Sequence, residues 1–99
     1  MNELNSVAQT ILEQLGGSKF KAMVGTTALY TASRTLAFDF KGSKKANVCS
    51  ITLTPMDLYE VKFYKVRGTQ VKAISKYDDI YNDMLTSVFE RETGLYTSL

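Results

Sequence analysis

The sequence predicts a single α+β domain (residues 1–99) of two layers: an antiparallel, four- to five-stranded meander sheet with N- and C-terminal helices packed on one face. Two observations predict this fold. Apolar residues recur at three- and four-residue spacing near both ends of the 99-residue chain, and they alternate with polar residues in between. Short turns join the alternating runs, so neighbouring strands pair antiparallel, and each amphipathic helix needs an apolar sheet face to cover. The chain is too short for a second hydrophobic core.

The first predicted element is an amphipathic helix over residues 3–15. Its apolar stripe consists of Leu4, Val7, Ala8, Ile11, Leu12 and Leu15. This spacing places the six side chains on one side of a helix. Gly16 and Gly17 end the helix, because glycine adopts the left-handed cap conformation at little steric cost.

Five runs of alternating apolar and polar residues follow and predict the strands. They cover residues 20–24, 35–41, 48–53, 59–64 and 71–73. Such alternation is typical of strands with one buried face, and it places Phe38 and Cys49 on that face. Pro55 predicts a tight turn before the fourth run, and residues 67–70 form the next turn. Residues 42–46 are expected to form a solvated loop. The sequence of residues 26–34 shows no pattern that predicts a helix or a strand.

The last predicted element is a second amphipathic helix. Asp78 or Asp79 is expected to cap its first turn, because a carboxylate accepts hydrogen bonds from free backbone amides and suits the positive end of the helix dipole. Its apolar stripe consists of Ile80, Met84, Leu85, Val88 and Phe89. Gly94 is placed to form the C-terminal cap.

Composition excludes the commonest catalytic groups. The chain has no histidine and one cysteine, Cys49. It therefore lacks a Ser-His-Asp or Cys-His pair, an imidazole metal ligand, an internal disulfide and a thiolate-rich zinc site. We expect a protein that is not an enzyme and needs no cofactor or metal. The first residues resemble neither a signal peptide nor a membrane span, so we expect a cytoplasmic location and no membrane partner.

Charge is unevenly distributed along the chain, although the net charge is only +2. Between residues 18 and 76 there are eleven basic and three acidic residues, whereas residues 77–99 contain five acidic residues and one basic residue. The sheet region is therefore predicted to be basic and the helices acidic. This separation also permits self-association between the basic sheet of one copy and the acidic helices of another.

A candidate binding surface follows from the charge pattern. It consists of Lys21, Lys62, Tyr64, Lys65, Arg67 and Lys72. On an open sheet face, such lysines could contact phosphates while the tyrosine stacks on a base. The alternative interpretation is that lysines on exposed strands prevent edge-to-edge pairing. The segment 62–68 matches no complete RNA-binding consensus, because its glycine and aromatic residues stand in the wrong order.

Three stretches of the chain, residues 11–20, 51–59 and 88–99, together resemble a group of small uncharacterised proteins encoded by bacteriophages and prophages. The resemblance implies a compact accessory protein in the cytoplasm of a bacterial host. Small phage proteins of this kind commonly bind nucleic acid or a host protein, such as a defence complex. The matching stretches are structural, so the resemblance assigns no site residue.

We therefore expect a non-enzymatic phage or prophage accessory protein that binds a macromolecular target, a host or defence protein that it inhibits or modulates. The first alternative is a nucleic-acid-binding module that uses the basic open face of the sheet. The second alternative is a self-assembling structural protein, a homo-oligomer.

Overall fold

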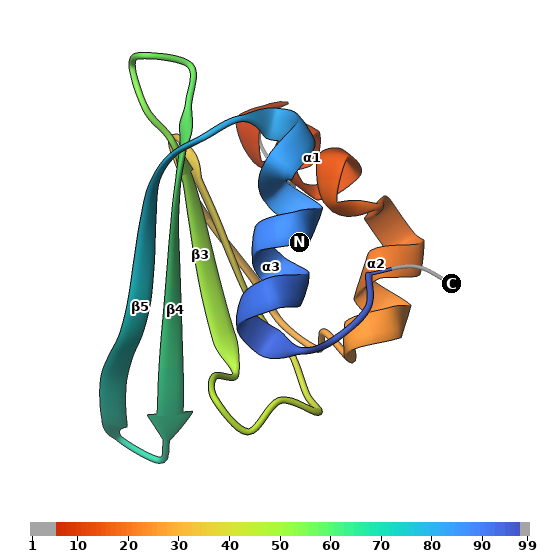
Figure 1. The fold of residues 1–99 in the computed structure, drawn as a ribbon, viewed down its shortest axis with the longest axis vertical. Helices are drawn as coiled ribbons and strands as arrows, with labels where there is room; N and C mark the ends of the chain where they lie inside the picture. Colours follow the sequence, from red (N-terminus) through yellow and green to blue (C-terminus); the bar gives the residue numbers. More distant parts are fainter. Residues whose placement is uncertain (1–5, 98–99) are drawn as a thin grey trace.

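A computed structural model describes residues 6–97 and shows a sheet covered on one face by helices (Figure 1). Its elements are α1 (Ser6–Leu15), α2 (Gly17–Val24), β1 (Leu29–Ala32), β2 (Thr35–Asp39), β3 (Val48–Leu53), β4 (Tyr59–Arg67), β5 (Gln70–Ile80), the short 3₁₀ helix η1 (Asn82–Met84) and α3 (Leu85–Thr93). The strands form an antiparallel meander in the order β1-β2-β3-β4-β5. The predicted α+β fold is confirmed, and the second face of the sheet is open.

The N-terminal helix α1 ends where the sequence predicts. Ala8, Ile11, Leu12 and Leu15 are buried. Gly16 then adopts a φ of 126° and donates its N–H to the Leu12 carbonyl, so the glycine ends the helix by its unusual backbone conformation. Leu4 and the predicted helix start at residue 3 lie outside the described residues.

The prediction of a strand over residues 20–24 is wrong, because this segment is the helix α2. Phe20 and Val24 are its buried residues, and Ala22 between them is exposed. Positions 20 and 24 lie four residues apart, so a single helical face can bury both of them. In a segment this short, alternation and helical spacing make nearly the same pattern.

The first strand is instead β1, within the segment that predicted no element. Leu29 packs against the core, but the next three residues are exposed. An edge strand with a single inward residue does not need alternating apolar residues, so the sequence of β1 shows no such pattern. The Asp39 carboxylate accepts the backbone N–H groups of Thr27 at 2.7 Å and Ala28 at 2.8 Å. These bonds hold the approach to β1 against the end of β2.

The predicted start of the C-terminal helix is also wrong. Asp78 and Asp79 do not cap a helix, because β5 continues through Ile80, which pairs with Tyr59. The helix α3 begins only at Leu85, after η1, and Met84 before it is exposed rather than part of a buried stripe.

The other end of α3 agrees with the prediction. Leu85, Val88 and Phe89 are buried. Gly94 adopts a φ of 76° and donates its N–H to the Glu90 carbonyl at 2.8 Å, which is a left-handed C-terminal cap.

The core lies between the sheet and the helices and centres on aromatic rings. The Phe89 ring lies with its centroid 5.0 Å from that of Phe40 and 5.3 Å from that of Phe20, both in edge-to-face geometry. Phe38 and Cys49 are fully buried, as predicted. Burial raises the pKa of the Cys49 thiol well above its ordinary range, so this cysteine packs as a small apolar residue.

Candidate binding surfaces

The six residues of the predicted surface do not lie together. Lys21 belongs to the helix α2 rather than to a strand, so its placement on the sheet is corrected. The other five lie on β4 and β5, but neighbouring positions of a strand point to opposite faces. Lys62 and Tyr64 alternate with the buried Val61 and Phe63 and therefore point to the open face.

Lys65 and Arg67 fall on the alternate positions of β4, which continue the helix-covered face. Lys72 pairs with Lys65 across β4 and β5 and shares its face. This side of the hairpin end is accessible, because Arg67 and Lys72 are exposed and Lys65 is half-buried. The structure thus divides the predicted site into two separate surfaces.

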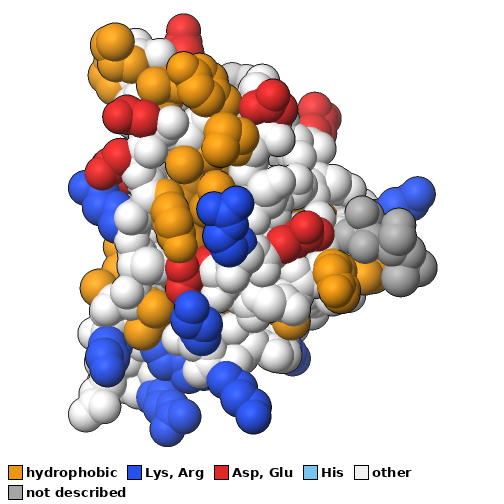
Figure 2. Space-filling view, in the orientation of Figure 1, with side chains coloured by type: hydrophobic (Ala, Val, Ile, Leu, Met, Phe, Trp, Pro, Cys, Tyr) orange, Lys and Arg blue, Asp and Glu red, His pale blue; other side chains and the backbone are white. Residues whose placement is uncertain are grey.

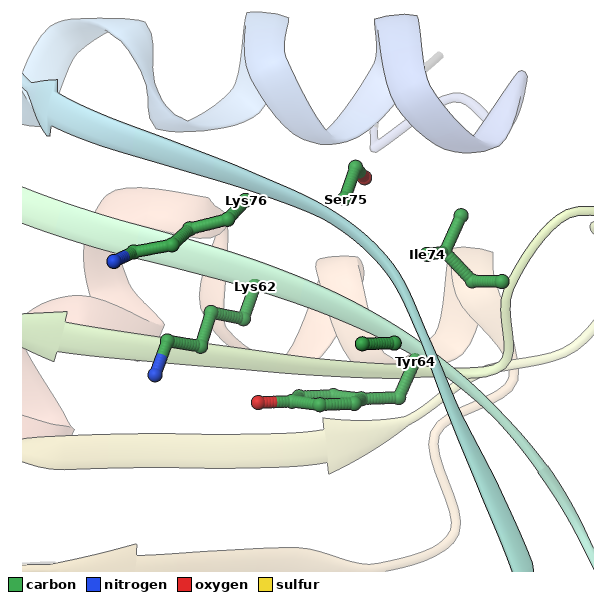
Figure 3. A pocket seen from close by; sticks show the side chains of 6 residues that line it. Lys62, Tyr64, Ile74, Ser75 and Lys76 are labelled. Atoms are coloured by element: carbon green, nitrogen blue, oxygen red, sulfur yellow. The ribbon is translucent and has the colours of Figure 1, made fainter.

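The first surface is a hollow on the open face, between β4 and β5. It has a volume of about 350 Å³. It is lined by Lys62, Tyr64, Ala73, Ile74, Ser75 and Lys76. Figure 3 shows Lys62, Tyr64 and Lys76 extending in a common direction, while Ser75 points toward α3.

A β-bulge lies beside this hollow. Phe63 pairs with Ser75 but Tyr64 pairs with Ala73, so Ile74 is an extra residue on β5. A bulge bends and twists the strand that contains it. Ala73 and Ile74, at this irregularity, line the hollow together with Tyr64.

Charges on the open face are paired with one another. The Lys62 Nζ atom lies 3.2 Å from Glu60 Oε1, and the Lys76 Nζ atom lies 3.5 Å from Glu60 Oε2 and 3.6 Å from Asp78 Oδ1. The hydrogen bond from Lys62 lowers the pKa of Glu60, and the same bond raises the pKa of Lys62. Such exposed pairs contribute little to stability, but they balance the charge. The open face is therefore not the basic surface that the sequence predicts.

The second surface, which we call the basic tip, lies at the end of the β4–β5 hairpin. It comprises Lys44, Lys45, Lys65, Arg67 and Lys72 around a hollow of about 340 Å³, which Gln70 and Ile74 also line. Figure 2 shows basic side chains gathered at this lower end, whereas acidic and hydrophobic side chains gather at the upper end. Lys65 and Lys72 are directly opposed, as are Arg67 and Gln70.

Sequence reasoning assigned Lys44 and Lys45 to a solvated loop and did not include them in the site. The sequence signal that could have indicated the basic tip is the adjacent pair of lysines, followed later in the chain by Lys65 and Arg67 at alternate positions of one strand. Only the meander topology brings the loop beside the hairpin end, since β3 lies between this loop and β4 in the chain.

One member of the basic tip has a buried partner. The Lys45 Nζ atom lies 3.3 Å from Oε2 of Glu92, whose side chain is 6% exposed. The Tyr77 hydroxyl donates a hydrogen bond to the other oxygen of Glu92. Burial raises the pKa of Glu92, but the hydrogen bonds from Tyr77 and Lys45 outweigh it and bring the pKa below its ordinary value. The same bond to Glu92 raises the pKa of Tyr77.

Within residues 6–97, no other carboxylate lies within the 4.0 Å ion-pair distance of a basic-tip cation. The described part of the chain also holds no group of three or more acidic or cysteine side chains arranged to bind a metal ion. In the same range, no helix has the length and apolar character needed to cross a membrane. Comparison of the chain with protein-family models, curated proteins and solved structures gave no match.

Proposed function

We propose that this chain is a non-enzymatic accessory protein that binds another protein on the open face of its sheet. The observation that carries the proposal is the hollow of about 350 Å³ beside Tyr64, on a face that the helices leave uncovered. An aromatic side chain in a hollow that Ala73 and Ile74 also line, with lysines around it, is a common arrangement in protein–protein interfaces.

The charge pattern of this face favours a protein partner over a nucleic acid. Lys62 and Lys76 already contact Glu60. A phosphate backbone would have to displace these carboxylates and would meet Asp78 as well. A protein surface that carries both positive and negative side chains can pair with the lysines and with the carboxylates. Fewer of the existing ion pairs are then broken without replacement when the partner binds.

The proposed setting is a bacterial cell that harbours a phage or prophage, with a host or defence protein as the target that is inhibited or modulated. The resemblance of residues 11–20, 51–59 and 88–99 to phage and prophage proteins supports this setting. Binding rather than catalysis is favoured because the chain has no histidine and its one cysteine is buried.

The test is capture of the partner from lysogenic or phage-infected bacteria with the tagged full chain, followed by measurement of dissociation rates. Tyr64→Ala removes the aromatic side chain of the hollow, and we expect it to weaken binding by about 2 kcal/mol or more, mainly through faster dissociation. Tyr81→Ala is the matched control, because Tyr81 is exposed outside this hollow. Equal capture by both variants, or capture of nucleic acid alone, would contradict the proposal.

A further inference from the structure

We infer that the basic tip is a second binding site, separate from the open face, that takes the phosphate backbone of a nucleic-acid duplex. The inference goes beyond the proposed function, because it concerns the opposite face of the β4–β5 hairpin and a different class of ligand. It rests on the charge, rigidity and shape of this end of the molecule.

The first argument is the arrangement of like charges. Lys65 and Lys72 occupy directly opposed positions on antiparallel strands, where side chains are close neighbours and like charges destabilise the pair. Arg67 follows on the same face, and of the five cations only Lys45 contacts a carboxylate within residues 6–97. An anion with several charged groups would relieve this repulsion.

The second argument is that the loop and the hairpin are fixed relative to each other. The Asn47 side chain donates Nδ2–H to the Val66 carbonyl and accepts the Val66 N–H at Oδ1, both at 2.8 Å. Lys45 is held at the other side of the loop by the buried Glu92. The backbone of the loop is therefore fixed beside that of the hairpin before a ligand arrives, which lowers the entropic cost of binding.

The third argument concerns the kind of anion. Lysine is depleted in protein–protein interfaces, which use aromatic anchors. Among the described residues that line this hollow, only Ile74 is apolar and none is aromatic. Clustered lysine and arginine without an anchor are typical of sequence-independent phosphate contacts.

The fourth argument favours a duplex over a single strand. Tyr64, which could stack on a base, points to the other face, and single-strand binding depends on such stacking. The turn between β4 and β5 lies beyond the end of α3 (Figure 1). A projecting two-stranded ribbon has a shape that the major groove of B-DNA admits.

The experiment is a titration of a labelled DNA duplex of random sequence with the full chain, at about 50 mM and about 200 mM salt. The four basic-tip cations that contact no carboxylate within residues 6–97 predict a fall in affinity of about 100-fold over this range. The double variant Lys65→Gln, Lys72→Gln should reduce the fall to about tenfold, because two phosphate contacts are removed. This variant should fold at least as stably as the parent protein, because it removes a repulsive pair.

The matched control is Lys62→Gln, Lys76→Gln, which removes the same charge from the open face. It should leave the salt dependence unchanged. Undetectable duplex binding at low salt, equal effects of the two double variants, or tighter binding of a single strand or of polyglutamate would each overturn the inference. The effect of Tyr64→Ala on the dissociation rate of the captured protein partner is measured separately from duplex binding. Failure of either proposal is therefore distinguishable from failure of the other.

Discussion

At the scale of single residues, the core depends on a small number of aromatic side chains that contact one another across the two layers. Phe38 on β2 meets Phe20 of α2 in edge-to-face geometry, with ring centroids 5.2 Å apart. It also lies 5.9 Å from Phe89 of α3. One buried ring thus joins the sheet to two helices.

Replacement of Phe38 by alanine should therefore lower the free energy of unfolding by about 3 to 5 kcal/mol, through loss of buried area and formation of a cavity. For a domain of this size, that is a large share of the total stability. Chemical denaturation followed by far-UV circular dichroism measures the change. Tyr30→Ala is the control, because Tyr30 is 64% exposed on neighbouring β1 and should change stability by less than about 1 kcal/mol. Similar losses in both variants would contradict the observed burial.

A second prediction at this scale concerns the buried carboxylate of Glu92 and acid stability. Its pKa in the folded protein lies below the ordinary value of 4.5, because hydrogen bonds from Tyr77 and Lys45 outweigh the effect of burial. Folding therefore favours the ionised form. This contribution is complete above the pKa of the unfolded chain and is lost as pH falls through the lower pKa of the folded protein.

The variant Glu92→Gln should be less stable than the parent protein near neutral pH, and the difference should narrow as pH falls from about 6 to about 3. Denaturant unfolding at several pH values measures it. Asp83→Asn, at an exposed position, is the control. Its free energy of unfolding, plotted against pH, should run nearly parallel to that of the parent protein. A constant difference between Glu92→Gln and the parent across this range would refute the role assigned to the carboxylate.

At the scale of elements, left-handed glycines define where two of the helices end. Gly25 closes α2 with a φ of 70°, and its N–H bonds to the Lys21 carbonyl. Gly94 closes α3 in the same way. Apart from its two chain neighbours, a β-carbon placed on Gly94 would meet no atom of residues 6–97 within 4 Å, so a substitution there tests backbone conformation without a steric clash.

Gly94→Ala should therefore destabilise the protein by about 1 kcal/mol, because alanine adopts positive φ unfavourably. Gly94→Asn should recover much of this loss, since asparagine tolerates the left-handed conformation. Urea denaturation of the two variants and the parent protein gives the comparison. An equal cost for alanine and asparagine would show that something other than the cap determines the effect.

At the scale of the whole molecule, the meander separates the charges toward opposite ends. The hairpin end of β4 and β5 and the loop before β3 bring five cations around one hollow. Acidic side chains gather toward the opposite end (Figure 2). The open face between these ends contains paired charges and the hollow beside Tyr64. Two surfaces of different chemistry therefore lie on opposite faces of one hairpin.

Much of this fold could be predicted from local patterns. The stripe of α1, the alternation in β2, β3 and β4, and the cap at Gly94 depend on residues close together in the chain, so the sequence determined them. The division between Lys62 and Lys65 was also present in the sequence, as the alternation of a strand. The face of Lys72 could not be predicted in this way, because the extra residue Ile74 shifts the alternation of β5 and places Lys72 opposite Lys65.

Tertiary structure decided the rest, because the deciding contacts are distant in sequence. Residues 20–24 became a helix since Phe20 packs against Phe38 and Phe89, whereas their spacing suits helix and strand alike. Pairing with β4 extended β5 through Ile80, where local signals predicted a helix cap. The basic tip formed only because a loop anchored through Asn47 lies beside the far end of the β4–β5 hairpin. Short-range periodicity determines which face of an element is apolar, but contacts between elements determine where each element ends and which charged side chains meet.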